Sequence, residues 1–298
     1  MAEGAKAKLY VGTSGWSYPD WEGTVYPKGK RIDQLEFIAE YFNAVELNNT
    51  FYRPPTAQMT ASWVRRTAEA KDFHFTLKLW QRFTHEREEA YTGEEVALFR
   101  RGIEPLAVSG RLGGILIQFP WSFQNTPESC ELVARICRDF GDYNKWIEVR
   151  HKSWESAESF KFFEGLKLGF ANIDQPVSKT SIGPSARLTS ESAYVRLHGR
   201  NYKAWFDHDA GANEKYNYLY SEDELKDWVD NIEKLRRQTV TVYAFLNNHY
   251  RGQAPANALQ LASRLTGRKV PVPKDLLETY PELKDIARAG SDKTGELF

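Results

Sequence analysis

The chain has no excess of charge of either sign. Its 298 residues contain 40 lysines and arginines and 40 aspartates and glutamates, so the formal net charge is zero. Proteins that bind nucleic acid or anionic membranes through their overall field usually carry a basic surplus. Binding of an anion by this chain must therefore depend on a local group of cations.

Long apolar runs and cysteines are equally scarce. No run approaches the roughly 18 apolar residues of a membrane-spanning helix, and residues 1–8 have no apolar segment of the kind found in a signal peptide. Cys130 and Cys137 share one helical pattern and lie about 10 Å apart along its axis, which exceeds the reach of a disulfide. These scarcities predict a cytoplasmic protein with reduced thiols and no contact with membranes.

Eight short apolar runs are expected to be strands, and segments of helical periodicity separate most of them. The expected strands are residues 9–14, 44–47, 73–79, 114–118, 146–149, 169–173, 193–197 and 240–246, and the expected helices are residues 34–42, 57–67, 94–108, 129–140, 159–166, 222–238 and 252–265. Such alternation gives parallel strands joined by right-handed crossovers. The chain is therefore predicted to be of the α/β class, a TIM (β/α)8 barrel in a single domain.

Three local features bear on this fold. No G-x-G-x-x-G motif follows the first strand, which disfavours the alternative of an open doubly wound sheet. The connection at residues 174–193 is short and rich in Ser, Gly and Pro, so the sixth helix is expected to be weak or missing. The eighth helix has Pro255 in its first turn, where proline favours a helix start.

The two ends of the chain lie outside the regular units. Residues 1–8 are expected to be disordered, residues 9–266 to form the barrel, and residues 267–298 to form a C-terminal extension. Within the extension, residues 273–289 are expected to be helical and packed on the barrel, and residues 290–298 to be a loose tail.

Alternation along each strand predicts which side chains face the barrel interior. Ile147 and Val149 are apolar and should pack on the helices, so Glu148 and Arg150 should point inward. The same test gives this inward set: Tyr10, Gly12, Ser14, Glu46, Asn48, Thr76, Lys78, Gln118, Glu148, Arg150, Asn172, Asp174, Arg196, His198, Tyr243, Phe245 and Asn247. The members at the C-terminal ends of the strands are polar or charged, and barrel enzymes carry their active sites at that face.

Carboxylates and cations are balanced in this inward set. The carboxylates are Glu46, Glu148 and Asp174, and the cations are Lys78, Arg150 and Arg196, with His198 beside them. A buried lone ion costs several kcal/mol, so these groups are expected to pair in one network. The alternative to a site is a salt-bridged plug that only fills the barrel mouth.

The loops that follow the strands are rich in aromatic residues. These are Trp16, Tyr18, Trp21, Phe51, Tyr52, Trp80, Phe83, Trp121, Phe123, Trp154, Tyr202, Trp205 and Phe206, and they include six of the nine tryptophans. Exposed aromatic rings there suit stacking on a sugar face or a nucleobase. The alternative is that they anchor the loops as small cores.

The same face carries five of the six histidines, His85, His151, His198, His208 and His249. None has a tight ligand spacing such as H-x-x-x-H, and the inward cations would repel a metal, so no cofactor is expected and a divalent metal is disfavoured. Bound phosphate or sulfate is expected instead, in the loops after strands seven and eight. The residues available there are Gly199, Arg200, Asn247, Asn248, Gly252 and Gln253, although Gly and Asn also serve turn geometry.

Five motifs in order resemble the YecE-like family, known as domain of unknown function 72. They are VGTSGWSYP at 11–19, VELNNTFY at 45–52, IEVRH at 147–151, RLHG at 196–199 and FLNN at 245–248. The resemblance covers residues 11–265 and implies a TIM barrel with no established activity.

The resemblance also implies likeness to barrels of the sugar-isomerase and endonuclease IV type, and so a possible action on nucleic acid. This chain departs from that template, because a multi-zinc nuclease needs His and acidic ligands at the strand ends. It has Lys78, Gln118, Arg150 and Arg196 there. A retaining glycosidase fits poorly too, since that class would place Glu at the ends of strands four and seven.

Three functions remain as hypotheses. The first is a metal-independent enzyme acting by acid–base chemistry on a small phosphorylated or carboxylated substrate, with Glu148 or Glu46 as base and His198 as acid. Its substrate-binding set would be Lys78, Arg150, Arg196, Asn48, Gln118, Asp174, Asn247, Asn248, Trp16, Tyr52 and Trp154. The second is a protein that binds or processes nucleic acid, and the third is a non-catalytic ligand-binding barrel. The sequence gives no basis for an oligomeric state.

Overall fold

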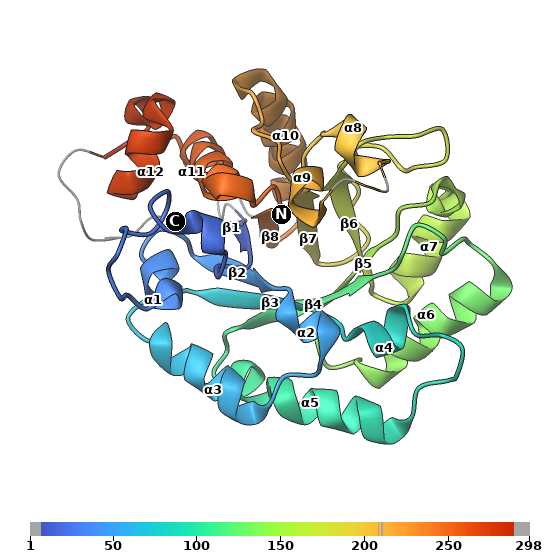
Figure 1. The fold of residues 1–298 in the computed structure, drawn as a ribbon. Helices are drawn as coiled ribbons and strands as arrows, with labels where there is room; N and C mark the ends of the chain where they lie inside the picture. The colour runs from blue at the N-terminus through green and yellow to red at the C-terminus, as the bar shows by residue number, and fades with distance from the viewer. Residues whose placement is uncertain (1–6, 208, 210, 289–298) are drawn as a thin grey trace.

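A computed structural model describes residues 7–207, 209 and 211–288. Eight parallel strands form a closed barrel in sequence order, as predicted (Figure 1). They are β1 (Lys8–Ser14), β2 (Ala44–Leu47), β3 (His74–Lys78), β4 (Leu112–Gln118), β5 (Lys145–Glu148), β6 (Gly169–Asp174), β7 (Ser192–Leu197) and β8 (Thr241–Leu246). Closure leaves no free sheet edge and brings all eight C-terminal strand ends to one face.

Helices surround the barrel (Figure 1). The longer ones are α1 (Gln34–Ala39), α3 (Ala57–Arg66), α5 (Gly93–Val108), α6 (Pro127–Asp139), α7 (Ala157–Gly165), α10 (Glu222–Arg236) and α11 (Gln253–Thr266). Local sequence sets their starts: Thr92 with Glu95, and Ser221 with Glu224, form capping boxes at α5 and α10. No helix lies between β6 and β7, which confirms the prediction for the sixth crossover.

Short helical turns follow the C-terminal ends of the strands and build the mouth of the barrel. They are η1 (Pro19–Trp21), α2 (Asn49–Tyr52), α4 (Gln81–Thr84), η2 (Lys152–Trp154), α8 (Tyr202–Trp205), α9 (Ala212–Lys215) and η3 (Tyr250–Gly252). None of the described helices is long and apolar enough to cross a membrane. Cys130 and Cys137 are both free thiols, as their spacing predicts.

The ends of the barrel differ from the predicted boundaries. Lys8 already belongs to β1 and Ala7 is buried, so the expected disorder of residues 7 and 8 is wrong. The expected helix at 273–289 is divided into α12 (Lys274–Thr279) and η4 (Pro281–Asp285). Its buried Leu276 and Leu283 join the same apolar cluster as α11. Residues 1–6 and the expected tail at 290–298 lie outside the described residues.

An aromatic layer fills the half of the barrel that lies away from the C-terminal face. Tyr10 stacks on His74 at 4.1 Å and on Tyr243 at 4.9 Å between ring centroids, and Trp146 lies 4.6 Å from Tyr194. The indole of Trp146 needs glycine beside it, because an added Cβ at residue 169 would lie 2.3 Å from its Cδ1. This layer closes the barrel from below, so any ligand must enter from the C-terminal face.

Strand β6 is an exception to the predicted inward set. Phe170, which shares the parity of Asn172 and Asp174, packs on Phe160 and Phe163 of α7. That parity therefore faces outward, and the prediction that Asn172 and Asp174 point into the barrel is wrong. The polar groups are satisfied outside instead, since the Asn172 side chain bonds the backbone of residue 187.

Candidate active site at the barrel mouth

A network of buried ions forms the floor of the mouth. The guanidinium of Arg196 on β7 lies between two carboxylates, with Nη2 donating to Glu46 Oε1 at 2.6 Å and Nη1 donating to Glu148 Oε2. All three side chains are almost completely shielded from solvent. Arg150 joins from the end of β5, donating to Glu148 Oε1 from Nη2 at 2.7 Å and from Nε at 3.1 Å. The parity test thus predicted the members of this network on β2, β5 and β7.

The remaining oxygens of the carboxylates are also occupied. Ser14 Oγ donates to Glu46 Oε1 at 2.7 Å, and the hydroxyl of Tyr194 donates to Glu46 Oε2 at 2.6 Å. Burial alone would raise the pKa of Glu148, but the guanidiniums of Arg196 and Arg150 hold the pKa well below its ordinary value. A carboxylate so stabilised is a weak base, which does not fit the general-base role predicted for Glu148.

His198 lies next to this network in its neutral form. Its burial lowers the pKa of the imidazole to about 4. Its Nδ1 lies 2.9 Å from the Asn247 amide nitrogen and accepts from it, so the ring proton is on Nε2, 3.4 Å from Glu148 Oε1. A general acid at neutral pH needs a higher pKa, so the predicted acid role of His198 is not supported by this geometry.

A pocket of about 310 Å³ opens above the floor. Seven predicted substrate-binding or inward residues line it: Asn48, Tyr52, Lys78, Gln118, Arg150, Arg196 and Asn247. Tyr18, Asn213, Tyr216 and His249 complete the wall. Glu46, Glu148 and His198 are fully buried and do not line this pocket, so the three predicted catalytic residues lie beneath its surface.

Lys78 is the exceptional cation of this pocket. Its Nζ lies 4.1 Å from the ring centroid of Phe51, and among the described residues no carboxylate approaches it within the 4.0 Å of an ion pair. Burial, and then the charge of Arg196, lower the pKa of its ammonium to about 7. The protonation equilibrium of Lys78 therefore lies near neutral pH.

A second hollow of about 430 Å³ adjoins the pocket at Arg150, and we call it the aromatic groove. It is lined by Trp121, Arg150, Gln175, Ser178, Thr180, Ser181, Trp205 and Phe206. Trp121 and Phe206 keep 47% and 45% of their surface exposed, which is unusual for rings of this size. The Arg150 guanidinium lies 5.6 Å from the Trp205 ring and so connects the two hollows.

Sequence reasoning missed the part of the groove contributed by the connection between β6 and β7. Gln175 is only 4% exposed, and its Oε1 has no hydrogen-bond partner in the part of the chain that the structure describes. A polar side chain directly after a strand end was a usable signal for Gln175. The sequence did not indicate that Tyr18 and His249 form one wall of the pocket. Their rings come from distant parts of the chain and stack at 4.3 Å between centroids.

Several predicted rim residues belong to the core. Trp154 is fully buried: it stacks on Phe123 and Phe163 at 5.4 and 5.6 Å, and its Nε1 donates to the carbonyl of Phe123 at 2.9 Å. Its predicted substrate-binding role is wrong, because a ligand cannot reach it. Trp21, Phe83 and Phe123 are buried as well, so for these residues the loop-anchoring alternative holds.

Three more predicted substrate-binding residues lie away from the pocket. Asp174 accepts from Arg200 at 2.9 Å and from the indole of Trp228 on α10 at 3.0 Å. Asn248 is buried and donates to Tyr218 and Asn257. Trp16 packs edge-on against Trp63 at 6.0 Å and lines neither the pocket nor the aromatic groove.

The predicted phosphate loops are also occupied by internal contacts. The backbone N–H of Gly199 donates to the Tyr220 hydroxyl at 2.8 Å, and Arg200 pairs with Asp174 and Glu224. The Gly199 N–H and the Nε and Nη1 of Arg200 are therefore engaged within the protein, and neither residue lines the mouth pocket.

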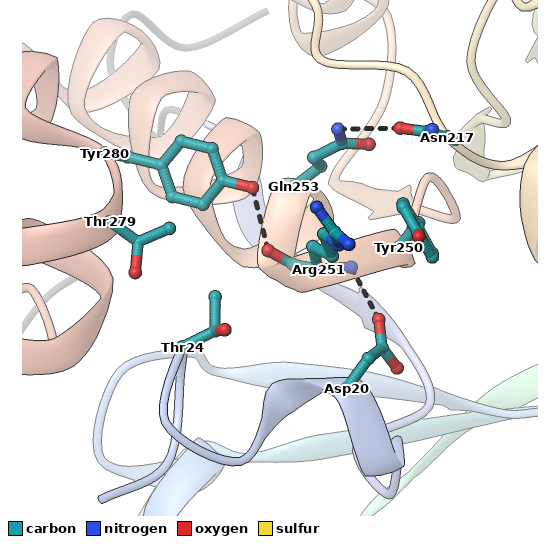
Figure 2. Close-up of a pocket in the computed structure, with 8 residues that line it drawn as sticks. All are labelled: Asp20, Thr24, Asn217, Tyr250, Arg251, Gln253, Thr279 and Tyr280. Atoms are coloured by element: carbon teal, nitrogen blue, oxygen red, sulfur yellow. Dashed lines mark hydrogen bonds between the residues drawn. The ribbon is translucent and has the colours of Figure 1, made fainter. Parts of the chain in front are cut away.

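A further hollow of about 670 Å³ lies beside the start of α11, and Figure 2 shows the residues that line it, Gln253 among them. Its polar groups largely bind one another: the backbone N–H of Arg251 donates to Asp20 at 2.5 Å, Tyr280 donates to the carbonyl of Arg251 at 2.7 Å, and Gln253 donates to Asn217 at 3.1 Å. The Asp20 carboxylate thus already supplies the anion near this helix start. We therefore place the candidate site at the mouth pocket rather than in this larger hollow.

The predicted histidines do not assemble around one point. His85 packs edge-on against Phe51, His151 accepts from the backbone N–H of Ser153, and His249 stacks on Tyr18. Over residues 7–207, 209 and 211–288, no three His, Cys, Asp or Glu side chains are grouped to hold a metal ion. His208 lies outside the described residues.

Comparison with known proteins agrees with the resemblance carried by the sequence motifs. Residues 10–281 match the model of the family described as "Protein of unknown function DUF72". The chain is 29% identical to UPF0759 protein YunF of Bacillus subtilis, over 86% of this chain and 94% of that protein. It is 25% identical to UPF0759 protein YecE of Escherichia coli O157:H7, over 92% and 95% of the two chains. The crystal structure of a DUF72 family protein from Thermotoga maritima superposes with a TM-score of 0.78 and 35% identity, covering 87% of this chain and 99% of that one.

Proposed function

This chain belongs to the DUF72 family of proteins of unknown function, and we propose that its barrel mouth binds a small anionic substrate with a planar ring and acts on it by metal-independent acid–base chemistry. The position of Arg150 supports this proposal most directly. Its guanidinium lines both the mouth pocket and the aromatic groove. One ligand can therefore place its anionic group in the pocket and its ring in the groove.

The anionic half of the ligand is matched by the charge of the mouth. Lys78, Arg150 and Arg196 carry three positive charges when Lys78 is protonated, and Glu46 and Glu148 carry two negative ones. Arg196 donates from Nη1 and Nη2 to the two carboxylates, whereas Arg150 donates to Glu148 from Nε and Nη2 and keeps Nη1 for a ligand. Lys78 and the Nη1 of Arg150 therefore form a local cationic site in a chain of zero net charge.

The ring half of the ligand is matched by the aromatic groove. Trp121, Trp205 and Phe206 give it apolar faces, and a ring there would also cover the Arg150 guanidinium. The buried Oε1 of Gln175 lacks a donor, and an unpaired buried acceptor gains from receiving a ligand N–H. These features favour a planar ring that carries an N–H group.

The acid–base step is assigned to Lys78 in place of Glu148, Glu46 and His198. Lys78 lines the pocket and has a pKa of about 7, whereas the other three are covered. In this proposal the two glutamates orient Arg150 and Arg196, and His198 supports Glu148 and Asn247.

Replacing Arg150 by glutamine is expected to weaken binding of inorganic phosphate about tenfold or more, because a charge-assisted hydrogen bond is lost. Thermal shifts against phosphate concentration would give the affinities. Arg200→Gln is the matched control, since Arg200 also follows a barrel strand, β7, but is paired with Asp174 and Glu224 outside the pocket. Equal losses in the two variants would contradict the assignment of the anion site to Arg150.

The aromatic groove is expected to add affinity for a ring. Uridine 5′-monophosphate should bind the wild type about tenfold more tightly than ribose 5-phosphate, since stacking on aromatic side chains is worth about 1–3 kcal/mol per base. Trp205→Ala and Gln175→Leu should each reduce that ratio toward one, while leaving ribose 5-phosphate binding unchanged. Calorimetric titration measures both ligands.

Equal affinities for the two ligands in the wild type would remove the ring from the proposal. Binding of a short single-stranded oligonucleotide that falls steeply with added salt, without binding of either monophosphate, would favour the nucleic-acid hypothesis in its place.

A further inference from the structure

We propose that the amine of Lys78 is a nucleophile that forms an imine with the carbonyl carbon of the substrate. The substrate class is then a phosphorylated or carboxylated aldehyde or ketone. This inference rests on the proposed function, because it assumes that an anionic ligand occupies the mouth pocket, and it goes further by naming the bond that forms there.

The surroundings of Lys78 distinguish it from a structural lysine. Lys78 lines the pocket, and its Nζ lies 4.1 Å from the centroid of the Phe51 ring. Within the described part of the chain no carboxylate lies within 4.0 Å of this nitrogen, so no ion pair holds it in the protonated form. Arg150 and Arg196 line the same pocket and add positive charge around it.

Lys145 shows what a structural buried lysine looks like in the same fold. It begins β5 near the opposite end of the barrel from the mouth, and its Nζ donates to the carbonyls of Tyr143 at 2.8 Å and of Gly141 at 3.4 Å. The Lys145 amine is thus held by backbone acceptors, whereas the Lys78 amine faces an open pocket. Only the second arrangement leaves the nitrogen available to a ligand.

The charge state of Lys78 supports the same role. Burial and neighbouring guanidiniums are the two means by which enzymes lower the pKa of a nucleophilic lysine, and here they lower that of Lys78 to about 7. About half of the molecules then carry a free amine at pH 7. For a lysine with the ordinary pKa near 10.4 that fraction is smaller by a factor on the order of 10³.

The step is balanced without a metal or an oxidant. The lone pair of Lys78 Nζ attacks the carbonyl carbon, the C=O π electrons move to oxygen, and proton transfer from nitrogen to that oxygen gives a carbinolamine. The nitrogen lone pair then forms the C=N bond while the hydroxyl takes up a proton and leaves as water. The resulting cationic imine accepts electrons from a breaking C–H or C–C bond next to it. The acid–base role proposed for Lys78 then consists of the proton transfers at its own nitrogen while the imine forms and is hydrolysed.

The first test is reductive methylation of the full-length protein with formaldehyde and cyanoborohydride, followed by peptide mass spectrometry at a series of pH values. Modification of Lys78 is expected to rise through about pH 7 and to level off about one pH unit higher, because little protonated amine remains there. Lysines with the ordinary pKa should continue to gain about tenfold per pH unit up to pH 10. Lys145 is the internal control for burial and should be modified much more slowly than Lys78.

The second test uses pyridoxal 5′-phosphate, an aldehyde that carries a phosphate, with borohydride to reduce the imine. One pyridoxyl group per chain is expected on Lys78, and inorganic phosphate should slow that labelling about tenfold by occupying the pocket. Lys78→Arg keeps the charge but removes the amine, so it should lose this label and no other.

The outcomes separate the inference from the proposed function. If the rate at Lys78 keeps rising to pH 10, or if Lys145 reacts as fast, the imine step is overturned. If phosphate binding still depends on Arg150 in that case, the proposed anion site is retained and only the imine step is lost. A plateau above about pH 7 without protection by phosphate would overturn the anionic substrate class.

Discussion

Replacing Arg196 by methionine is expected to lower the free energy of unfolding by about 3–5 kcal/mol at pH 7. The reason is that the guanidinium holds two fully buried carboxylates, through Nη2 to Glu46 at 2.6 Å and through Nη1 to Glu148. Glu148 keeps Arg150, but Glu46 has no other ion pair among the residues that the structure describes. Its charge would remain in the barrel without a cation.

The matched control is Arg66→Met. Arg66 also binds a carboxylate with two hydrogen bonds, both 2.6 Å, but both partners, Arg66 and Asp33, keep about a third of their side-chain surface in solvent. Loss of such an exposed pair is expected to cost only about 0.2–1 kcal/mol. Urea denaturation of the three proteins gives the comparison. A cost for Arg196→Met no greater than that of the control would mean that the buried network does not hold the barrel mouth together.

Acidification should act on the same network. The pKa of Glu148 is well below its ordinary value in the folded protein because of Arg196 and Arg150. Its contribution to stability is therefore complete above the ordinary glutamate pKa near 4.3 and is lost as the pH falls through the lower folded value. Arg196→Met removes one of the two guanidiniums beside Glu148. The free energy of unfolding of this variant should therefore depend less steeply on pH below about 4.5 than that of the wild type.

The fold could be predicted from the sequence because local and global signals agree. All eight expected strands overlap the observed ones, and the one crossover without helical periodicity is the one without a helix. The parity test placed Glu46, Glu148 and Arg196 correctly because their neighbours on each strand, such as Ile147 and Val149, are unmistakably apolar. Alternation of this kind determines the direction of a side chain without knowledge of its partners.

Strand β6 shows why the same test fails elsewhere. It assumes that helices cover the outer face of every strand, so that polar residues must face inward. No helix lies between β6 and β7, and the irregular connection supplies polar partners in its place. Asn172 bonds the backbone of residue 187 and the hydroxyl of Ser185, which makes an outward polar residue inexpensive. The missing helix was predicted, but its consequence for side-chain direction was not.

The chemistry of the site was harder to predict than its location. Sequence gives residue types at strand ends, but the depth of each one depends on how the loops close over it. Glu148 and His198 are covered, whereas Lys78, expected only to hold an anion, lines the pocket with a pKa near neutrality. Depth decides the role here, because a covered carboxylate bound by two guanidiniums cannot act as a base toward a ligand above it.

Trp154→Ala is expected to lower the free energy of unfolding by about 3–5 kcal/mol, the usual cost of removing a fully buried aromatic side chain. Trp154 is completely enclosed between Phe123 and Phe163, and its Nε1 donates to a backbone carbonyl that would be left without this donor. Residual folded protein should bind uridine 5′-monophosphate with unchanged affinity, because Trp154 does not line the aromatic groove.

Trp121→Ala provides the opposite case with the same substitution. Trp121 is 47% exposed and lines the aromatic groove, so its loss should change stability by no more than about 0.5 kcal/mol while weakening uridine 5′-monophosphate binding several-fold. Chemical denaturation and calorimetric titration of both variants separate the two effects. The reverse pattern, a stable Trp154→Ala protein that no longer binds the nucleotide, would place Trp154 on the rim where its position after β5 first suggested it. The contrast follows from depth alone, since both tryptophans come shortly after a strand end and only one of them faces solvent.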